Sequence, residues 1–410
     1  MMILSLQWIL MMKIITREYL NELIEYIGTP DIKVITGIRR SGKSKLLECF
    51  AEYILKNYSD VNIIQIDFYK LEFEELQEYH KLYNYIVSRY EENKRNFVII
   101  DEVQLCKNFE KTINSLYTDG KYDIYISGSN AFLLSSNLAT LFTGRTIELK
   151  IFPFSYKEYM NYYELNNAID SFDDYVLSGG LAGSYLYPTE KSKLNYIANV
   201  YETIIERDLI KRKRIKNVVL LKKISSFLID NVSNLTSINN ITNILSDKTM
   251  PTNDKTVGSY IENLCQAYLF YRVTRYDIRG KKYLSSLEKY YLSDHAIKYA
   301  VLGKKDMNYG RIYENIVAIE LLRRGYELYV GVLYKKEIDF VAMKRDEKIY
   351  IQVADNISDE TTFKGEVESL LKIKDAYPKI IIARTKHPEY MYEGIRIIDI
   401  GEWLIGKTNN

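Results

Sequence analysis

The sequence contains few cysteines, and this excludes two classes of protein. Its three cysteines, Cys49, Cys106 and Cys265, are far apart in a chain of 410 residues. They follow neither a metal-binding spacing nor a disulfide pattern. We therefore expect a protein of the reducing cytoplasm rather than a secreted, disulfide-stabilised one.

A long hydrophobic stretch is also missing from the sequence. The opening run MMILSLQWILMM, residues 1–12, is too short to span a bilayer. It has no basic leader before it and no small-residue cleavage site after it. We interpret residues 1–11 either as a short packed segment or as residues upstream of the true start. We expect no membrane partner.

The net charge is small, since 56 basic residues stand against 54 acidic ones. The distribution is uneven, however, because residues 207–310 contain 19 Lys and Arg but only 9 Asp and Glu. A local excess of this size favours contact with a phosphate backbone. Double-stranded DNA is therefore a candidate partner of residues 207–310.

The most specific motif is a glycine-rich loop between an apolar strand, IKVIT (32–36), and an amphipathic helix. This is the context in which a P-loop binds phosphates, because backbone N–H groups and the helix N-terminus face the anion. We predict ATP as the ligand, with Lys43 reaching the β- and γ-phosphates and Ser44 binding Mg²⁺. The predicted nucleotide-binding residues are Gly37, Ile38, Arg39, Arg40, Ser41, Gly42, Lys43, Ser44 and Lys45.

A second apolar strand ends in two acids at Asp101 and Glu102. Ligands of open α/β sheets lie at the carboxyl ends of strands, so we predict that Asp101 holds Mg²⁺ and Glu102 polarises the attacking water. The alternative is that the pair only caps a helix. The presence of Glu102 favours hydrolysis over simple nucleotide binding.

Two further strands end or begin with polar residues. The strand 122–127 leads to Ser129 and Asn130. One of these residues contacts the γ-phosphate or its water, or else the two only form the turn after the strand. Arg145 stands just before the strand 146–151, and it is either an arginine finger for a neighbouring subunit or a surface residue. A finger acting in trans would require a homo-oligomer.

Strands near 33–36, 61–66, 97–100, 123–127 and 146–151, with helices between them, predict a five-stranded parallel α/β domain. At these motifs the chain resembles prokaryotic AAA+-type ATPases that carry a C-terminal domain of unknown function. The resemblance implies a sensor at Ser129 or Asn130 and a finger at Arg145, so the candidate catalytic residues are Lys43, Glu102, Asn130 and Arg145. The resembling segments are GIRRSGKS (37–44), IIDEVQ (99–104), ISGSNAFLLSS (126–136), LFTGR (141–145), FPFSYKEY (152–159), LSGGLAGSY (177–185), YETIIERDLIKR (201–212), KKEIDFVAMK (335–344) and YIQVAD (350–355).

The middle of the chain predicts a winged helix-turn-helix. Residues 195–216 have the pattern of one helix with a basic end, and helical patterns follow at 233–244 and 254–270. A hairpin turning at residues 279–282 would be the basic wing. Many winged helices bind proteins only, so DNA binding remains one of two alternatives.

The last part of the chain resembles a restriction-endonuclease-like core of degenerate PD-(D/E)xK type. Its helix 311–324 contains Glu314, and the following strands contain Asp339 and Gln352. An active enzyme needs an acid and a lysine where this chain has Gln352 and Ala354, so we expect no strong nuclease activity. The predicted domains are an ATPase core at 13–160, a helical lid or linker at 161–216, the winged helix at 217–305 and the nuclease-like domain at 306–406.

Three functions follow from these motifs. The leading one is a cytoplasmic, Mg²⁺-dependent ATPase that couples hydrolysis to a DNA- or protein-binding C-terminal module. The second is a nucleotide-gated DNA-binding switch with little turnover. The third, an ATP-driven nuclease, is opposed by Gln352 and Ala354.

Overall fold

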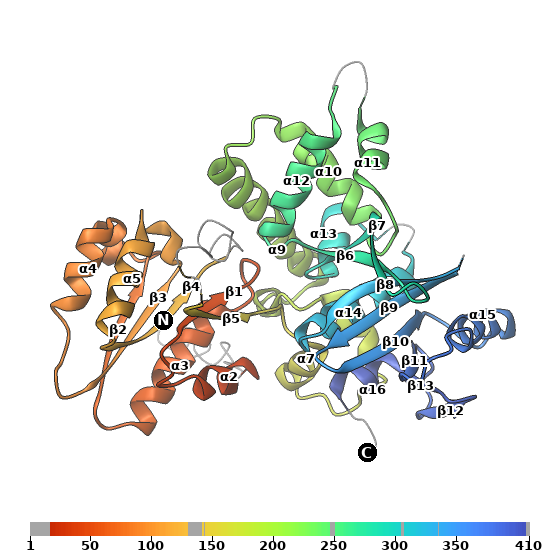
Figure 1. Cartoon of the computed structure of the whole chain (residues 1–410), viewed down its shortest axis with the longest axis horizontal. Coiled ribbons are helices and arrows are strands. Elements are labelled where there is room, and N and C mark those ends of the chain that lie inside the picture. The colour runs from red at the N-terminus through yellow and green to blue at the C-terminus, as the bar shows by residue number, and fades with distance from the viewer. Residues whose placement is uncertain are drawn as a thin grey trace. The chain divides into compact units, whose positions relative to one another are not determined.

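A computed structural model describes residues 17–129, 142, 144–246, 251–304, 307–334 and 336–406, apart from the side chains of residues 285 and 286. The chain forms two compact units. The described residues of 17–151, with 266–268, form what we call the N-terminal unit. Those of 152–265 and 269–406 form the C-terminal unit. Figure 1 shows both units coloured along the chain.

The N-terminal unit is built on a five-stranded sheet in the order β2-β3-β4-β1-β5. Each pair of neighbours is parallel, which confirms the predicted α/β core. All five predicted strands are present. They are β1 (Ile32–Thr36), β2 (Val61–Asp67), β3 (Arg95–Asp101), β4 (Tyr122–Ser127) and β5 (Thr146–Lys150).

Helices pack on both faces of this sheet, as a parallel sheet requires. On one face, α4 and α5 bury Ile86 and Ile113 against strand residues such as Val98. On the other face, Phe50 of α3 lies 4.6 Å, centroid to centroid, from Tyr125 of β4. The helical elements of the N-terminal unit are α2 (Tyr19–Glu25), α3 (Lys43–Asn57), η1 (Leu71–Gln77), α4 (Tyr79–Val87), η2 (Val103–Leu105) and α5 (Phe109–Asp119).

The C-terminal unit contains an eight-stranded mixed sheet in the order β12-β13-β11-β10-β9-β8-β6-β7. Strands β8, β9 and β10 form an antiparallel meander, whereas β10, β11 and β13 are parallel. The strands are β6 (Phe270–Asp277), β7 (Lys282–Leu292), β8 (Glu327–Leu333), β9 (Lys336–Lys344), β10 (Glu347–Ala354), β11 (Lys379–Ala383), β12 (Tyr390–Tyr392) and β13 (Ile395–Asp399).

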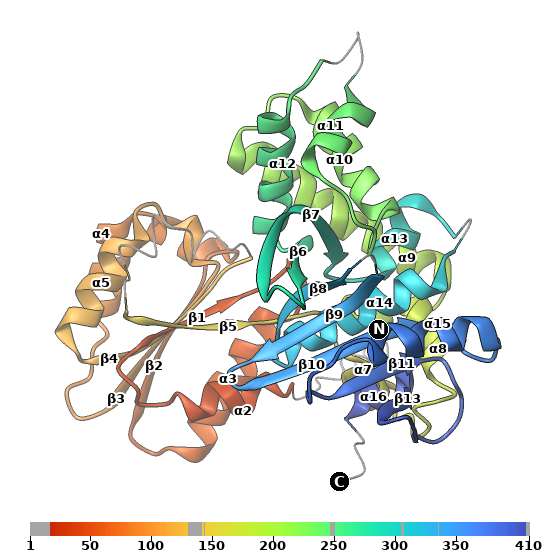
Figure 2. The ribbon, with the colours of Figure 1, turned by 45° about the vertical axis from the view of Figure 1, so that its right-hand side comes forward.

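The predicted hairpin is present but is not the wing of a separate sheet. Strands β6 and β7 pair on either side of the turn at residues 278–281. Strand β6 also pairs in parallel with β8, with Arg275 opposite Val330. Figure 2 shows the hairpin continuing the C-terminal sheet. The predicted boundary between residues 305 and 306 therefore divides strands that share one sheet.

Helix α14 packs on one face of this sheet, against β7, β8, β9 and β10, and α15 lies over β9, β10 and β11. The predicted helix at 195–216 is α9 continued by the π-helical turn η5. The helical elements of the C-terminal unit are α7 (Tyr156–Tyr163), α8 (Phe172–Ser178), η4 (Ala182–Leu186), α9 (Glu190–Thr203), η5 (Ile204–Lys211), α10 (Val218–Asp230), α11 (Ile238–Leu245), α12 (Asp254–Gln266), α13 (Ala296–Leu302), α14 (Tyr309–Arg323), α15 (Glu360–Leu371) and α16 (Ile400–Ile405). Among the described residues, no helix is long and apolar enough to cross a membrane.

Candidate nucleotide-binding site

The glycine-rich loop leaves the carboxyl end of β1 and enters α3, as the sequence predicted. Gly37 has φ +139°, and a Cβ at this position would lie 2.1 Å from the carbonyl oxygen of Ile151. Only glycine fits this close approach of two backbones. Gly42 is also left-handed, with φ +97°, and it forms the N-cap of α3. The loop conformation therefore depends on both glycines of the motif.

Lys43, the first residue of α3, is buried and folded back over the loop. Its Nζ donates hydrogen bonds to the carbonyl oxygens of Gly37 at 2.9 Å and Ile38 at 3.0 Å. The Ser41 carbonyl accepts a hydrogen bond from Arg17 at 2.5 Å. The buried Ser41 Oγ has no hydrogen-bond partner among the described residues. An ammonium, an unused hydroxyl and a helix N-terminus are donors that suit a phosphate group.

Asp101 and Glu102 lie at the same edge of the sheet, where β3 ends. The Ser127 hydroxyl, from the end of β4, donates to Asp101 Oδ1 and accepts from the Glu102 backbone N–H at 3.2 Å. The Ser129 hydroxyl donates to Glu102 Oε2 at 3.2 Å, and the Gln104 amide donates to the same oxygen. Glu102 has φ +55°, which is uncommon for a residue with a side chain. Two strand ends thus fix the position of this carboxylate.

Glu102 is 6% exposed, and its surroundings shift its proton affinity. Burial raises the pKa of Glu102, the charges of Lys43 and Arg39 oppose this rise, and the charge of Asp101 adds to it. A carboxylate with a raised pKa is a better proton acceptor, as a general base must be. The structure therefore brings Lys43, Asp101, Glu102 and Ser129 together at one edge.

Of the other two predicted catalytic residues, only Arg145 is described, and it does not join this group. Asn130 lies outside the described residues. Arg145 precedes β5, and Thr146 pairs with Ile32 at the start of β1, so Arg145 lies at the amino ends of the strands, opposite the loop. Its guanidinium stands over Tyr117, 5.1 Å from the ring centroid. A role for Arg145 at the nucleotide of a neighbouring subunit remains a prediction.

The described part of the chain contains no group of three or more His, Cys, Asp or Glu side chains that could hold a metal ion. The predicted ligands of Mg²⁺, the Ser44 hydroxyl and the Asp101 carboxylate, are two oxygen donors. This donor set suits Mg²⁺ bound together with substrate phosphates and water rather than in a cage of protein ligands.

In the C-terminal unit, the predicted acids surround a lysine that the sequence analysis missed. Lys289 of β7 is 2% exposed, and its Nζ lies 2.7 Å from Glu314, 2.7 Å from Glu337 and 3.8 Å from Asp339. Burial opposes the charge on Lys289, but the three carboxylates raise its pKa overall. An ammonium group thus lies between Glu314 and Asp339.

Gln352, which replaces the acid of an active nuclease-like site, makes a hydrogen bond at each end of its amide. Its Oε1 accepts from the Asp339 backbone N–H at 2.7 Å, and its Nε2 donates to Glu366 at 2.6 Å. Asp339 in turn accepts from the Val353 backbone N–H at 2.8 Å. Gln352 therefore links β9 to α15.

Replacing Lys289 with methionine is expected to destabilise the protein by about 3–5 kcal/mol, because buried carboxylates lose their counter-ion. Chemical unfolding of the full chain, compared with the exposed control Lys282→Met on the same strand, measures this loss.

This loss of stability should also depend on pH. Burial raises the pKa of Glu314 to about 8. Lys289 lowers the Glu314 pKa, so this pKa rises further in the variant. Above about pH 8 the unaltered chain stops losing stability as Glu314 ionises, whereas the variant continues to lose it, so the deficit should be larger at pH 9 than at pH 6. Equal stability of the two variants would contradict the role assigned to Lys289.

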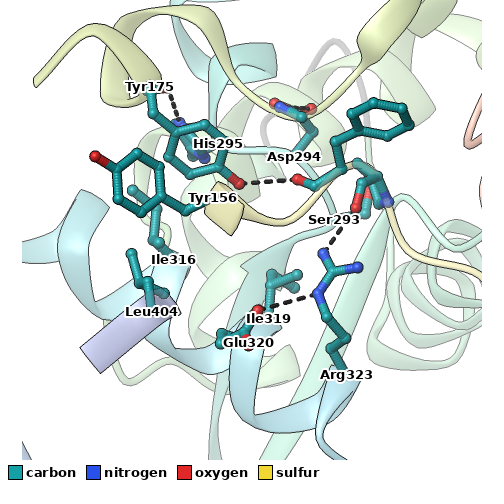
Figure 3. Close-up of a pocket in the computed structure, with 13 residues that line it drawn as sticks. Tyr156, Tyr175, Ser293, Asp294, His295, Ile316, Ile319, Glu320, Arg323 and Leu404 are labelled. Carbon is teal, nitrogen blue, oxygen red and sulfur yellow. Dashed lines mark hydrogen bonds and ion pairs between the residues drawn. The ribbon is translucent and has the colours of Figure 1, made fainter. Parts of the chain in front are cut away.

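Gly180 of the LSGGLAGSY segment lines a small cavity of about 20 Å³ in the C-terminal unit, room for a single water molecule. A Cβ on Gly180 would lie 2.4 Å from the Phe154 carbonyl oxygen, and the Gly180 N–H donates to Asp294 at 2.7 Å. Figure 3 shows Asp294 and His295 above the cavity and Arg323 paired with Glu320 at 3.0 Å below it. These contacts explain Gly180 by packing rather than by ligand binding.

A model of a known protein family matches the N-terminal unit. Residues 29–160 match the family model described as AAA domain, and residues 169–308 match a domain of unknown function (DUF8612). The structure of AMPPCP-bound DnaA from Aquifex aeolicus is similar with a TM-score of 0.31 and 17% identity, covering 62% of this chain and 90% of that one.

Two relatives match nearly the whole chain. An uncharacterized protein of Methanocaldococcus jannaschii is 28% identical, covering 94% of this chain and 88% of that protein. An uncharacterized protein of Haemophilus influenzae is 38% identical over 398 residues, covering 95% of this chain and 98% of that protein. The chain belongs to the same family as the Haemophilus influenzae protein, and its N-terminal unit has the P-loop fold of an AAA domain.

Proposed function

We propose that the N-terminal unit hydrolyses ATP with Mg²⁺ and that this hydrolysis drives a C-terminal unit that acts on DNA or on another protein. The observation that carries the proposal is the buried Glu102 at the sheet edge beside Lys43 of the loop. Lys43 follows β1 and Glu102 follows β3, and both strands pair in parallel with β4, so the two residues lie at the same carboxyl edge of the sheet.

Each residue at this edge has a role in the proposed reaction. The loop N–H groups and Lys43 bind the phosphates, and Ser44 and Asp101 hold Mg²⁺, which neutralises charge on them when bound. Glu102 takes a proton from the attacking water. Ser129, whose hydroxyl contacts Glu102 at 3.2 Å, orients that carboxylate. Asn130 as a second sensor and Arg145 as a finger from a neighbouring subunit complete the site.

A second candidate function is a nucleotide-gated switch with little turnover. It is favoured by the two donors, Gln104 and Ser129, that engage one oxygen of Glu102. A carboxylate held by two donors is a weaker base than one accepting none. A nuclease is not favoured, since Lys289 lies among the acids that would bind its metal.

Release of phosphate from ATP by the purified full chain tests the proposal. With Mg²⁺ we expect steady turnover that stops when EDTA removes the metal, and stimulation by duplex DNA if the C-terminal unit binds it. ATP binding without turnover would favour the switch. Absence of ATP binding would contradict both candidate functions.

A further inference from the structure

Three tyrosines form an aromatic cluster on one face of the C-terminal sheet, in which Tyr276 is buried, Tyr329 is half-buried and Tyr283 is exposed. We call Tyr276, Tyr283 and Tyr329 the tyrosine platform. Tyr276 of β6 and Tyr283 of β7 are directly paired, and Tyr329 lies on the neighbouring strand β8. The ring centroids are 5.5 Å (Tyr276–Tyr283), 6.0 Å (Tyr276–Tyr329) and 5.1 Å (Tyr283–Tyr329) apart. Tyr283 is 66% exposed.

The platform continues the sheet face on which α15 packs. Tyr276 and Tyr329 belong to the same hydrophobic cluster as Val367 and Leu370 of α15. Helix α15 lies over β9, β10 and β11, whereas the platform lies over β7, β6 and β8. Figure 2 shows these three strands side by side at one end of the sheet. Aromatic side chains therefore line the part of this face beyond α15.

Cationic side chains stand over one ring of the platform and over two other tyrosines of the C-terminal unit. The Lys348 ammonium lies 5.4 Å from the Tyr276 centroid and 4.8 Å from that of Tyr377. The Arg279 guanidinium, in the β6–β7 turn, lies 5.3 Å from the centroid of Tyr334, which is 68% exposed. Flat rings and positive charge thus share one surface.

The turn next to the platform adds further positive charge. Arg279, Lys281 and Lys282 are all exposed. Three nearby acids, Asp277, Glu327 and Asp375, accept hydrogen bonds from neutral donors and keep their charge. The cations of this region are Arg279, Lys281, Lys282 and Lys348, one more than the three acids. The surface is therefore complementary to a polyanion that also presents planar apolar groups.

We propose that the tyrosine platform binds single-stranded nucleic acid, with bases stacking on Tyr283 and Tyr329 and phosphates contacting the cations of residues 279–282. Unpaired bases stack on aromatic side chains whatever their sequence, and a basic groove follows their backbone. In a duplex the bases are stacked on one another, so a sheet face lined with tyrosines suits a single strand better. This inference rests on the proposed function in one respect, since it names single-stranded nucleic acid as the partner on which the C-terminal unit acts.

Fluorescence anisotropy of the full chain with labelled oligothymidylate of about 20 nucleotides tests the proposal. Loss of the stacking of one base means that Tyr283→Ala should weaken binding roughly 5- to 150-fold, while Tyr283→Phe keeps the ring and most of the affinity. Tyr390→Ala is the matched control, because Tyr390 is 42% exposed on β12, at the opposite edge of the same sheet. Lys282→Ala should make the affinity for the oligonucleotide fall less steeply with salt concentration, by an amount equal to roughly one phosphate contact.

Three results would overturn the proposal. They are equal affinity for the duplex and the single strand, unchanged binding by Tyr283→Ala, and binding to vesicles containing phosphatidylserine but to no oligonucleotide. Comparing the affinities for oligouridylate and oligothymidylate shows whether the platform prefers RNA or DNA. Tight binding of either oligonucleotide supports the proposal. Without nucleotide, the Lys43→Ala protein should bind the oligonucleotide as the unaltered chain does, so failure of ATP hydrolysis and failure of strand binding are separately visible.

Discussion

Replacing Lys43 with alanine is expected to weaken the binding of Mg²⁺–ATP by roughly 10- to 150-fold and to abolish measurable hydrolysis. Hydrogen bonds to a charged partner contribute about 1.5–3 kcal/mol each, and every 1.4 kcal/mol is about tenfold in affinity. The Lys43 ammonium already points into the loop, 2.9 Å and 3.0 Å from its carbonyl oxygens. Isothermal titration of the purified full chain with ATP in Mg²⁺ measures the change.

The matched control for this variant is Lys56→Ala. Lys56 is an exposed residue in the last turn of the same helix, α3, so its loss removes the same charge far from the loop. Thermal unfolding of both variants shows whether the Lys43 protein is folded. A folded Lys43→Ala protein that binds and hydrolyses ATP as well as Lys56→Ala would show that the loop is not the nucleotide site.

Replacing Glu102 with glutamine is expected to reduce ATP hydrolysis by about 10²- to 10⁴-fold, the usual contribution of a general base, while ATP binding stays within about twofold. Glutamine has nearly the same shape, and its carbonyl oxygen can accept the hydrogen bond from Ser129. What it lacks is the capacity to accept a proton from water. Single-turnover hydrolysis, measured beside ATP affinity, separates the two effects.

Asp67→Asn provides the matched control for the Glu102 variant. Asp67 ends β2 and pairs with Asp101 in register, so it lies at the same sheet edge on the neighbouring strand. Its Oδ1 accepts from the Tyr69 backbone N–H at 2.9 Å, a bond that asparagine keeps. If both amide variants slow hydrolysis equally, the effect belongs to the charge of the whole edge and Glu102 is not the base.

The N-terminal unit follows closely from the sequence because its signals are local. Buried parallel strands have apolar, β-branched runs, and β1 and β3 are each buried from end to end except at Arg95. The loop lies directly between β1 and α3, so its location needed no long-range information. The contact of Ser127 with Asp101 joins two strand ends 26 residues apart, and strand order was required to place it.

The C-terminal sheet was harder to predict because its order depends on pairing between distant segments. The hairpin β6–β7 was visible as two strands around a turn, but its parallel pairing with β8 crosses about 50 residues of chain that include α13 and α14. Strands β12 and β13 and helix α16 were not predicted, since they are short and carry weak periodicity.

The contacts of Lys289 were also difficult to predict from the sequence, because its partners are distant in the chain. Lys289 directly precedes the apolar run YYL at the end of β7. A charged group beside such a run signals a buried partner, because a charge is seldom buried unpaired. Its partners Glu314 and Glu337 come from α14 and β9, and only their arrangement in space identifies them. An active nuclease would have a lysine where this chain has Ala354, and the lysine that lies beside Glu314 and Asp339 comes from β7 instead.

The central claim is that the loop holds ATP and that Glu102 hydrolyses it. The most direct test is to incubate three proteins with γ-labelled ATP and Mg²⁺, isolate each protein rapidly, and identify the nucleotide that it retains. The account predicts that the unaltered chain retains ADP and releases labelled phosphate, that Glu102→Gln retains intact ATP, and that Lys43→Ala retains neither. An unaltered chain that retains no nucleotide, or a Glu102→Gln protein that releases phosphate as fast as the unaltered chain, would contradict it.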